Sequence, residues 1–334
     1  FCNWFVLPCA VVSISAKSIS LSMDCSFDHP NYELDPNGTL RRKSGAGSLT
    51  SSDARNAEDA SVIEAVTDYV QAKMKSMGLV EHWIPDPEDE ARCNIFMSNL
   101  DKSSKLLLIL QNQVGSKPGI WSRSLCLSKG LKVGSMISAI ERALDAGYAV
   151  SVLNPNTNSV VQNKERVPIA NSFSPENHVL HVWDTLIAAA SNISSVYLLT
   201  YGNGSSLAVD IVQRQIVRCA ANPGEAMRIR AIAAIEASQV IEGGESGGDN
   251  DNATKSTLKA MTLAYEGSRL FEYPVRLRSK EAKLGCPCIS VGMDKMLGEG
   301  DEPNVAASVG LSLESALGFF EFAEKPNSGI YELG

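Results

Sequence analysis

A turn with the shape of a catalytic elbow lies within residues 194–209, which read SSVYLLTYGNGSSLAV. Its first half is β-branched and aliphatic, which predicts a strand, and a helix is predicted to follow the Gly-Asn-Gly turn. Serine hydrolases present their attacking hydroxyl at such a strand–turn–helix junction, in the motif G-x-S-x-G. The nucleophile position of that motif is Gly202, followed by Asn203 and Gly204. The sequence therefore predicts an elbow suited to acyl chemistry that lacks the attacking atom.

The histidines do not supply a base at the place in the chain where such chemistry needs one. In α/β-hydrolases the triad follows the chain order Ser, then Asp or Glu, then His. The chain has four histidines, at positions 29, 82, 178 and 181, and all of them precede the elbow. Ser205 and Ser206 lie just beyond the apex, where a serine hydroxyl favours a capping or first-turn role. We therefore predict no catalytic residues.

Two acidic residues are candidates for polar groups in a pocket. Glu236 follows a predicted strand at 229–235, and Asp294 follows another at 287–292. Ligands of α/β proteins bind beyond the carboxyl ends of the strands. We expect Glu236 and Asp294 to lie at that edge of the sheet.

His178 is a third candidate pocket group, because it lies on a predicted helix with His181 and Asp184 at successive i+3 steps. This spacing suits metal ligands, but it suits a His–Asp hydrogen bond on a polar helix face better, because no second ligand pair is evident. A phosphate-binding P-loop is absent, and Leu207 breaks a G-x-G-x-x-G fingerprint. We predict neither a metal nor a cofactor.

Strands and helices alternate along the chain, which predicts an α/β fold with a mostly parallel sheet and helices on both faces. The predicted strands are 105–110, 148–153, 195–200, 229–235 and 287–292, and the predicted helices are 58–77, 135–146, one starting at 174, 205–221 and 311–323. Polar loops are predicted at 154–173 and 242–253. We expect an apolar segment and flexible linker over 1–57 and a single α/β-hydrolase-like domain over 58–334.

The composition favours a globular chain that contacts proteins rather than nucleic acid. The 334 residues are 44% apolar, and the net charge is −8 at pH 7. Phosphate backbones are held mainly by clustered Lys and Arg, so we expect no direct nucleic-acid binding. A local exception is the mixed-charge segment 269–283, RLFEYPVRLRSKEAK. Eight scattered cysteines without a C-x-x-C pair favour buried thiols over a zinc site or a disulfide framework.

The N-terminal residues leave two compartments open. Residues 1–16, FCNWFVLPCAVVSISA, have the apolar character of a secretory signal but no basic region before it, and Met23 is a plausible start. We expect a nuclear or cytoplasmic protein, or a secreted or endoplasmic-reticulum protein if residues 1–22 are a signal. Apart from such a signal we expect no membrane contact, because no other run reaches about 20 apolar residues.

Several collinear segments resemble a known family. They are YELDPNGTLR at 32–41, WSR at 121–123, IERALDAGY at 140–148, VLNPN at 152–156, PENH at 175–178, VWD at 182–184, the glycine elbow, VGMD at 291–294 and FF at 319–320. Together they resemble the Arb-two (argonaute-binding protein two) domain. That domain occurs in a fission-yeast argonaute–siRNA chaperone complex, in animal cotranscriptional regulators of alternative splicing, and at the C-terminus of some class II histone deacetylases.

The resemblance implies an α/β-hydrolase-like scaffold in small-RNA-linked gene silencing or cotranscriptional regulation, with argonaute-type, chromatin or splicing proteins as partners. Family members carry His-Ser-Tyr-Gly-Gly at the elbow, Asp-Ser-Val-His after the next strand, and a histidine after a late Gly-Thr-Asp. Those positions are here 201–204 (YGNG), 236–239 (EASQ) and 292–296 (GMDKM). We therefore expect a pseudoenzyme, with a serine hydrolase that pairs Ser205 with Glu236 or Asp294 as the alternative.

Overall fold

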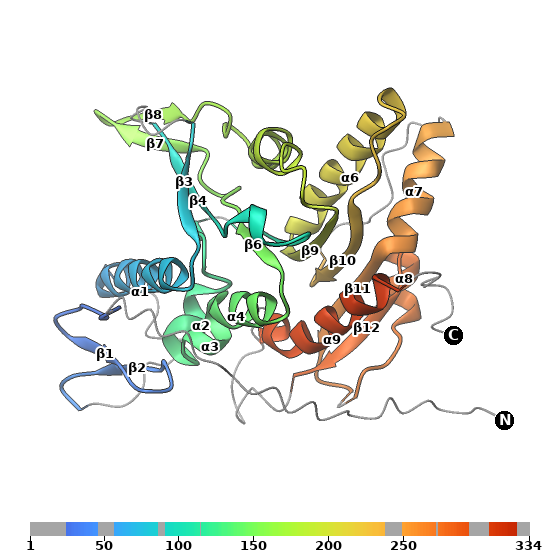
Figure 1. The fold of residues 1–334 in the computed structure, drawn as a ribbon. Coiled ribbons are helices and arrows are strands. Elements are labelled where there is room, and N and C mark those ends of the chain that lie inside the picture. Colours follow the sequence, from blue (N-terminus) through green and yellow to red (C-terminus); the bar gives the residue numbers. More distant parts are fainter. Residues whose placement is uncertain are drawn as a thin grey trace.

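The computed structural model describes residues 25–45, 57–85, 91–113, 115–237, 249–271, 273–293 and 307–325 (Figure 1). One eight-stranded sheet forms its centre, in the order β12-β11-β10-β9-β5-β6-β4-β3. The strands are β3 (Val80–Ile84), β4 (Cys93–Met97), β5 (Lys105–Asn112), β6 (Ala149–Val152), β9 (Ser195–Gly202), β10 (Ile229–Ile235), β11 (Thr262–Ser268) and β12 (Cys288–Gly292). The predicted α/β-hydrolase-like class, with a mostly parallel sheet, is confirmed.

The sheet is parallel from β12 to β6 and antiparallel at one end. β5 pairs in parallel with both β6 and β9, and β9, β10, β11 and β12 continue in the same direction. β4 runs antiparallel to both β6 and β3. A parallel strand buried on both faces reads as a continuous apolar run, and β5 (KLLLILQN) is such a run.

Alternate side chains of the central strands fill two apolar layers. Leu107 and Ile109 of β5 join Tyr197 and Leu199 of β9 in one layer, and the intervening leucines lie in the other. The first layer packs against α1 (Ala57–Ser76), α2 (Arg123–Ser128), α4 (Ile137–Asp145) and α9 (Ala307–Ala323). The second packs against α5 (Pro175–Val182), α6 (Gly204–Ala221), α7 (Asp249–Met261) and α8 (Arg278–Leu284). Figure 1 shows α6 and α7 on the opposite side of the sheet from α4 and α9.

Helix α5 begins as its sequence predicts. The Ser174 hydroxyl accepts a hydrogen bond from the N–H of Asn177 at 3.1 Å, and Pro175 takes the first helical position. The helix then widens into a π-helical turn, η2 (Trp183–Ile187), in which the N–H of Ala188 donates to the carbonyl of Trp183. This widening keeps both Trp183 and Ile187 buried in the second layer.

Two short hairpins lie outside the sheet, and each falls where the sequence predicted loop or linker. β7 (Ser159–Gln162) and β8 (Glu165–Pro168) pair within the predicted loop 154–173, so that prediction was wrong for these residues. β1 (Tyr32–Leu34) and β2 (Leu40–Arg42) pair within the predicted segment 1–57, and Tyr32 and Leu40 pack against α1. The linker prediction over 46–56 lies outside the described residues.

The remaining elements are short or were not predicted. η1 (Leu100–Lys102) precedes β5, and α3 (Leu131–Gly134) follows α2. Helix α7 begins at Asp249, inside the predicted loop 242–253, whose earlier residues lie outside the described ranges. Among the helices of the described ranges, none combines the length and the apolar character that crossing a membrane requires.

Candidate functional site

The elbow between β9 and α6 keeps the backbone of a nucleophile turn. Gly202, the last residue of β9, has a φ of +57°, a conformation that favours glycine. A Cβ built on Gly202 would meet no atom within 4 Å, so the apex opens onto free space. The predicted elbow residues Gly202, Asn203 and Gly204 therefore form a tight turn that presents bare backbone.

Gly204 fixes how closely α6 approaches the sheet. A Cβ at this position would overlap the carbonyl oxygen of Leu110 in β5. The glycine thus lets the first turn of α6 lie directly against the backbone of the neighbouring strand. The elbow has this geometry because of backbone packing, independently of any catalytic side chain.

Ser205, three residues beyond the apex, is engaged with the preceding strand. The Ser205 hydroxyl lies 3.0 Å from the Thr200 hydroxyl, and both side chains are buried. The first-turn role predicted for Ser205 is thus a buried pairing with the preceding strand, because α6 has no side-chain cap. Ser206 also lies in the first turn, where its N–H donates to the carbonyl of Asn203 at 3.2 Å.

The carboxyl end of β5 is closed by amide side chains. The Gln111 side chain donates to the carbonyl of Trp121 at 3.2 Å, and the Asn156 side chain donates to the carbonyl of Gln111 at 3.1 Å. The Trp121 ring packs edge-on against Tyr201, the residue before the apex, with ring centroids 6.3 Å apart. These contacts fill the sheet edge beside Gly202 with fixed polar and aromatic groups.

Glu236 lies at the same edge, directly after β10, as predicted. Its Oε1 accepts a hydrogen bond from the N–H of Gly267 at 2.6 Å, and the Ser308 hydroxyl at the start of α9 also bonds to its carboxyl group. The residue has a φ of +50°, which is uncommon for glutamate. Burial raises the pKa of Glu236 to about 7, and the bonds from Gly267 and Ser308 only partly oppose that rise.

His178 is a structural histidine. Its Nε2 accepts a hydrogen bond from the backbone N–H of Asn154 at 3.1 Å, so the neutral ring carries its proton on Nδ1. Nδ1 lies 2.9 Å from the Ser172 hydroxyl. Burial, together with a smaller effect of the charge of His181, lowers the pKa of His178 to about 3. With both ring nitrogens occupied, His178 ties α5 to the two ends of the 154–172 segment.

His178, His181 and Asp184 do not form a metal site. Asp184 faces α6, where its carboxylate lies 3.7 Å from Arg214 and 3.5 Å from Arg218. Across the described ranges, no group of three metal-ligating side chains is close enough to hold an ion. The other two histidines lie away from the elbow: His29 contacts Ser61 of α1, and His82 is exposed on the edge strand β3.

The structure thus brings Gly202 and Glu236 to one edge of the sheet and places His178 in a separate network two strands away, beyond β5 and β6. Asp294 lies outside the described residues. The sequence did not predict Gly267 and Ser308 as partners of Glu236, because each comes from a different element. The serine near the start of the last predicted helix was the only available signal.

A family comparison identifies the chain. The Arb2 domain model matches residues 48–242, more than half of the 334 residues. The chain belongs to this family. The resemblance seen in the collinear segments is therefore confirmed, and the glycine elbow lies within the matched Arb2 region.

Curated relatives of this Arb2-family chain are cotranscriptional regulators. It is 36% identical over 99 residues to the cotranscriptional regulator ARB2A homolog of Dictyostelium discoideum, which covers 28% of this chain and 26% of that protein. It is 26% identical over 206 residues to the Xenopus tropicalis ARB2A homolog, which covers 46% of this chain and 49% of that protein. The Arb2-family chain thus spans at most about half the length of these relatives.

Solved structures with a similar fold include deacetylases and esterases. A histone deacetylase from Saccharomyces cerevisiae is 11% identical, with a TM-score of 0.46 over 78% of this chain and 96% of that chain. The esterase Est22 is 10% identical, with a TM-score of 0.43 over 85% of this chain and 96% of that chain. These likenesses concern the fold alone.

Replacing Glu236 by glutamine should stabilise the protein at high pH. The carboxyl pKa rises from 4.5 to about 7 on folding, so stability is lost as the pH rises from 4.5 through 7. Glutamine keeps an acceptor for the Gly267 N–H without the buried charge. We expect the free energy of unfolding of Glu236→Gln at pH 8 to exceed that of the parent by about 1–3 kcal/mol, with no gain near pH 4.5.

Urea denaturation at both pH values measures this difference. The matched control is Glu266→Gln, which removes an ion pair with Lys280 and should not stabilise the protein at either pH. A gain of equal size at both pH values would contradict a buried, raised-pKa carboxyl at Glu236.

Replacing His178 by glutamine should make stability less dependent on acid pH. The folded-state pKa of about 3 lies below the ordinary value of 6.5. Between these two pH values the imidazole is protonated in the unfolded chain and neutral in the folded chain. The parent therefore loses stability as the pH falls through this window, by about 1.4 kcal/mol per pH unit between pH 6 and 4. The free energy of unfolding of His178→Gln should fall less steeply, by about 1.4 kcal/mol per pH unit. The control His82→Gln, at an exposed site, should show the same pH dependence of stability as the parent. Parallel stability curves for the parent and His178→Gln would rule out a buried neutral imidazole.

Proposed function

We propose that this Arb2-family chain is a non-catalytic, hydrolase-shaped binding module that works in the nucleus, in cotranscriptional regulation or small-RNA-linked heterochromatin silencing. The observation that carries the proposal is the elbow apex, where Gly202 has a φ of +57° and open space in place of an attacking side chain. The curated relatives, named as cotranscriptional regulators, support the process.

The surroundings of the apex support a non-catalytic role. A serine nucleophile needs a base within hydrogen-bond reach. His178 and His29 are hydrogen-bonded elsewhere, and His82 lies exposed on the edge strand β3. Loss of a nucleophile or of its base lowers hydrolase rates by about 10⁴-fold to 10⁶-fold. The hydroxyl of Ser205 is paired with that of Thr200, 3.0 Å away.

The acidic chain is expected to act through protein partners of argonaute, chromatin or splicing type, without direct nucleic-acid contact. One surface suits such a partner. The segment after β11 exposes Leu270 and Tyr273, whose exposed fractions are 87% and 71%, together with Phe271 and Val275. Residues 269–283 carry five basic and two acidic side chains in a chain of net charge −8. This contrast favours an acidic partner segment that carries apolar side chains.

We expect no covalent labelling by a fluorophosphonate probe, because Gly202 has no hydroxyl and the Ser205 hydroxyl is buried against Thr200. The chain and its Gly202→Ser variant should both stay unlabelled by mass spectrometry, since the variant restores a hydroxyl without a base. A serine esterase labelled in the same reaction is the positive control. Stoichiometric labelling of any serine at 202–206 would overturn the non-catalytic assignment and favour the hydrolase alternative.

The exposed segment after β11 should carry partner binding. In affinity capture from nuclear extract, we expect the chain to enrich argonaute-type, chromatin or splicing proteins. The double substitution Leu270→Ser and Tyr273→Ser should lower that recovery about tenfold, the usual cost of losing apolar anchors. Val217→Ser, at an exposed apolar residue of α6, is the matched control and should keep full recovery. Equal losses in both variants, or no enriched nuclear protein, would contradict the proposal.

A further inference from the structure

The hairpin β1–β2 ends in an exposed turn that carries Ser44. The turn is closed by the N–H of Gly45, which donates to the carbonyl of Arg42 at 3.1 Å, and Gly45 has a φ of +78°. The Ser44 side chain is exposed, and its hydroxyl forms no hydrogen bond to the described residues. Ser44 therefore presents a hydroxyl that an enzyme can reach.

Two arginines precede this hydroxyl at fixed spacing. Arg41 and Arg42 stand three and two residues before Ser44, in the sequence Arg-Arg-Lys-Ser. Serine kinases of the basophilic class select substrates by such charge patterns, because carboxylates of the kinase pair with each guanidinium. Only one other serine of the chain, Ser279, has an arginine three residues before it, and it has none two residues before it.

Both arginine side chains are accessible at the surface of the hairpin. β2 is extended and pairs only with β1, and the Arg41 side chain is 61% exposed. Arg41 donates to Asp35 Oδ2 from Nε at 3.0 Å and from a terminal nitrogen at 2.9 Å, and a kinase carboxylate would replace Asp35 in this exposed pair. Arg42 lies over the Tyr32 ring, 5.6 Å from its centroid. Ser279, in contrast, lies in helix α8, and Arg276 before it pairs with Glu281.

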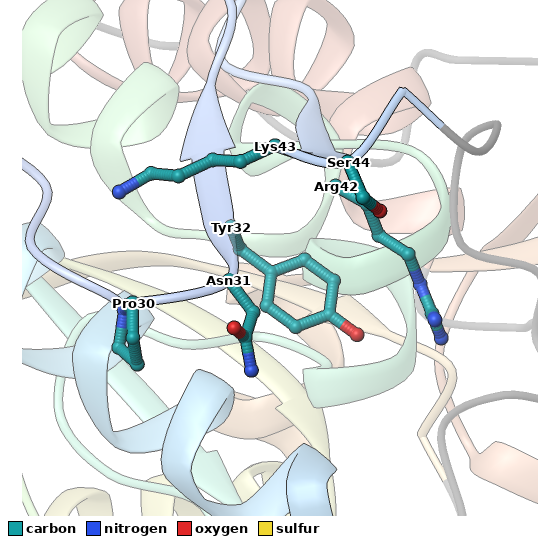
Figure 2. Close-up of a pocket in the computed structure, with 6 residues that line it drawn as sticks. All are labelled: Pro30, Asn31, Tyr32, Arg42, Lys43 and Ser44. Atoms are coloured by element: carbon teal, nitrogen blue, oxygen red, sulfur yellow. The ribbon is translucent and has the colours of Figure 1, made fainter.

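The surroundings of Ser44 also suit the product. Ser44 and Arg42 line a hollow of about 170 Å³ together with Pro30, Asn31, Tyr32 and Lys43. Figure 2 shows the Ser44 side chain beside the Arg42 side chain, with the Tyr32 ring next to them, whereas Lys43 points away. A phosphate on Ser44 would thus have the Arg42 guanidinium within its reach.

We propose that Ser44 is a phosphorylation site for a basophilic serine kinase, with Arg42 as the partner of the bound phosphate. In the transfer, the bond from the γ-phosphorus of ATP to the β,γ-bridging oxygen breaks and a bond from that phosphorus to Ser44 Oγ forms. ADP leaves with the bridging oxygen, and the hydroxyl proton passes to the catalytic carboxylate of the kinase. The product carries about −1.5 to −2 charges beside Arg42, which offsets most of the positive charge of the neighbouring basic side chains.

Phosphorylation of the full chain by the catalytic subunit of a cyclic-AMP-dependent kinase, mapped by mass spectrometry, tests the acceptor. We expect Ser44 to be the main site, Ser44→Ala to lose most of the incorporated phosphate, and Arg41→Ala to lower the initial rate about tenfold or more. Lys43→Ala is the matched control, because removal of a neighbouring cation outside the recognised spacing should change the rate less than about twofold. All substituted side chains are exposed or half-buried at the surface, and circular dichroism checks that the variants fold.

Other outcomes would overturn the proposal. Phosphate on Ser279 or on serines of 46–56 at a rate equal to that of Ser44 would remove the special role of the two arginines. An unmodified Ser44 in the folded chain, when a synthetic peptide of residues 38–48 is modified, would mean that the hairpin hides the site.

The Arg42 contact has its own readout, the second ionisation of the phosphate followed by ³¹P NMR. A nearby guanidinium favours the dianion, so this pKa should lie about half a unit below the value of about 6 for an unpaired phosphoserine. Arg42→Gln, phosphorylated to completion by long incubation, should return it to that value. Identical titrations of the two proteins would refute the contact.

Discussion

The close approach of helix α6 to strand β5 is the constraint on which the functional edge depends. Gly204 brings the first turn of the helix against the carbonyl of Leu110, where no other residue type fits without displacing backbone. Asn203 alone connects β9 to α6, and Gly202 before it has a positive φ. The apex is tight because two backbones meet, and the sheet order then brings Asn112 and Glu236 to either side of it.

A geometry that depends on backbone packing does not depend on a catalytic side chain at the apex. The apex retains its turn with glycine at the exposed position, and glycine adopts that φ without steric cost. The polar groups around it are bonded to one another: Gln111 to Trp121, Ser205 to Thr200, and Glu236 to Gly267. The polar groups beside the apex are thus engaged in hydrogen bonds, while the apex itself opens onto free space, an arrangement that fits the proposed binding role.

Much of the fold could be predicted from the sequence, because parallel strands buried on both faces are continuous apolar runs. β5, β9 and β10 were predicted for this reason, and β10 was predicted at its observed bounds. β3 and β4 lie at the antiparallel end of the sheet and were missed because neither is a continuous apolar run: VEHWI has a single buried position, and Asn94 interrupts CNIFM. The hairpin β7–β8 was missed because its strands are polar and only four residues long.

Only those features of the site that follow from the order of residues along the chain could be predicted. The glycine at the apex and the positions of the histidines can be read from the sequence, and Glu236 follows from its place after an apolar strand. The partners of these residues could not be predicted. His178 bonds to a backbone N–H 24 residues away and Glu236 to one 31 residues away, and the folded sheet creates both proximities. The same packing buries both groups, and burial lowers the pKa of His178 and raises the pKa of Glu236.

The outer edge of β12 is covered by the segment before it, which affects how the sheet could associate with other copies. An open strand edge is a template on which another chain can add a strand, and proteins block such edges to avoid fibrils. Beside β12, the chain folds back so that Leu277 donates to the carbonyl of Cys288 and Ser290 donates to the carbonyl of Val275. The Cys288 carbonyl and the Ser290 N–H, with which an added strand would pair, are thus already hydrogen-bonded. Addition of a strand from a second copy is therefore hindered at this end of the sheet.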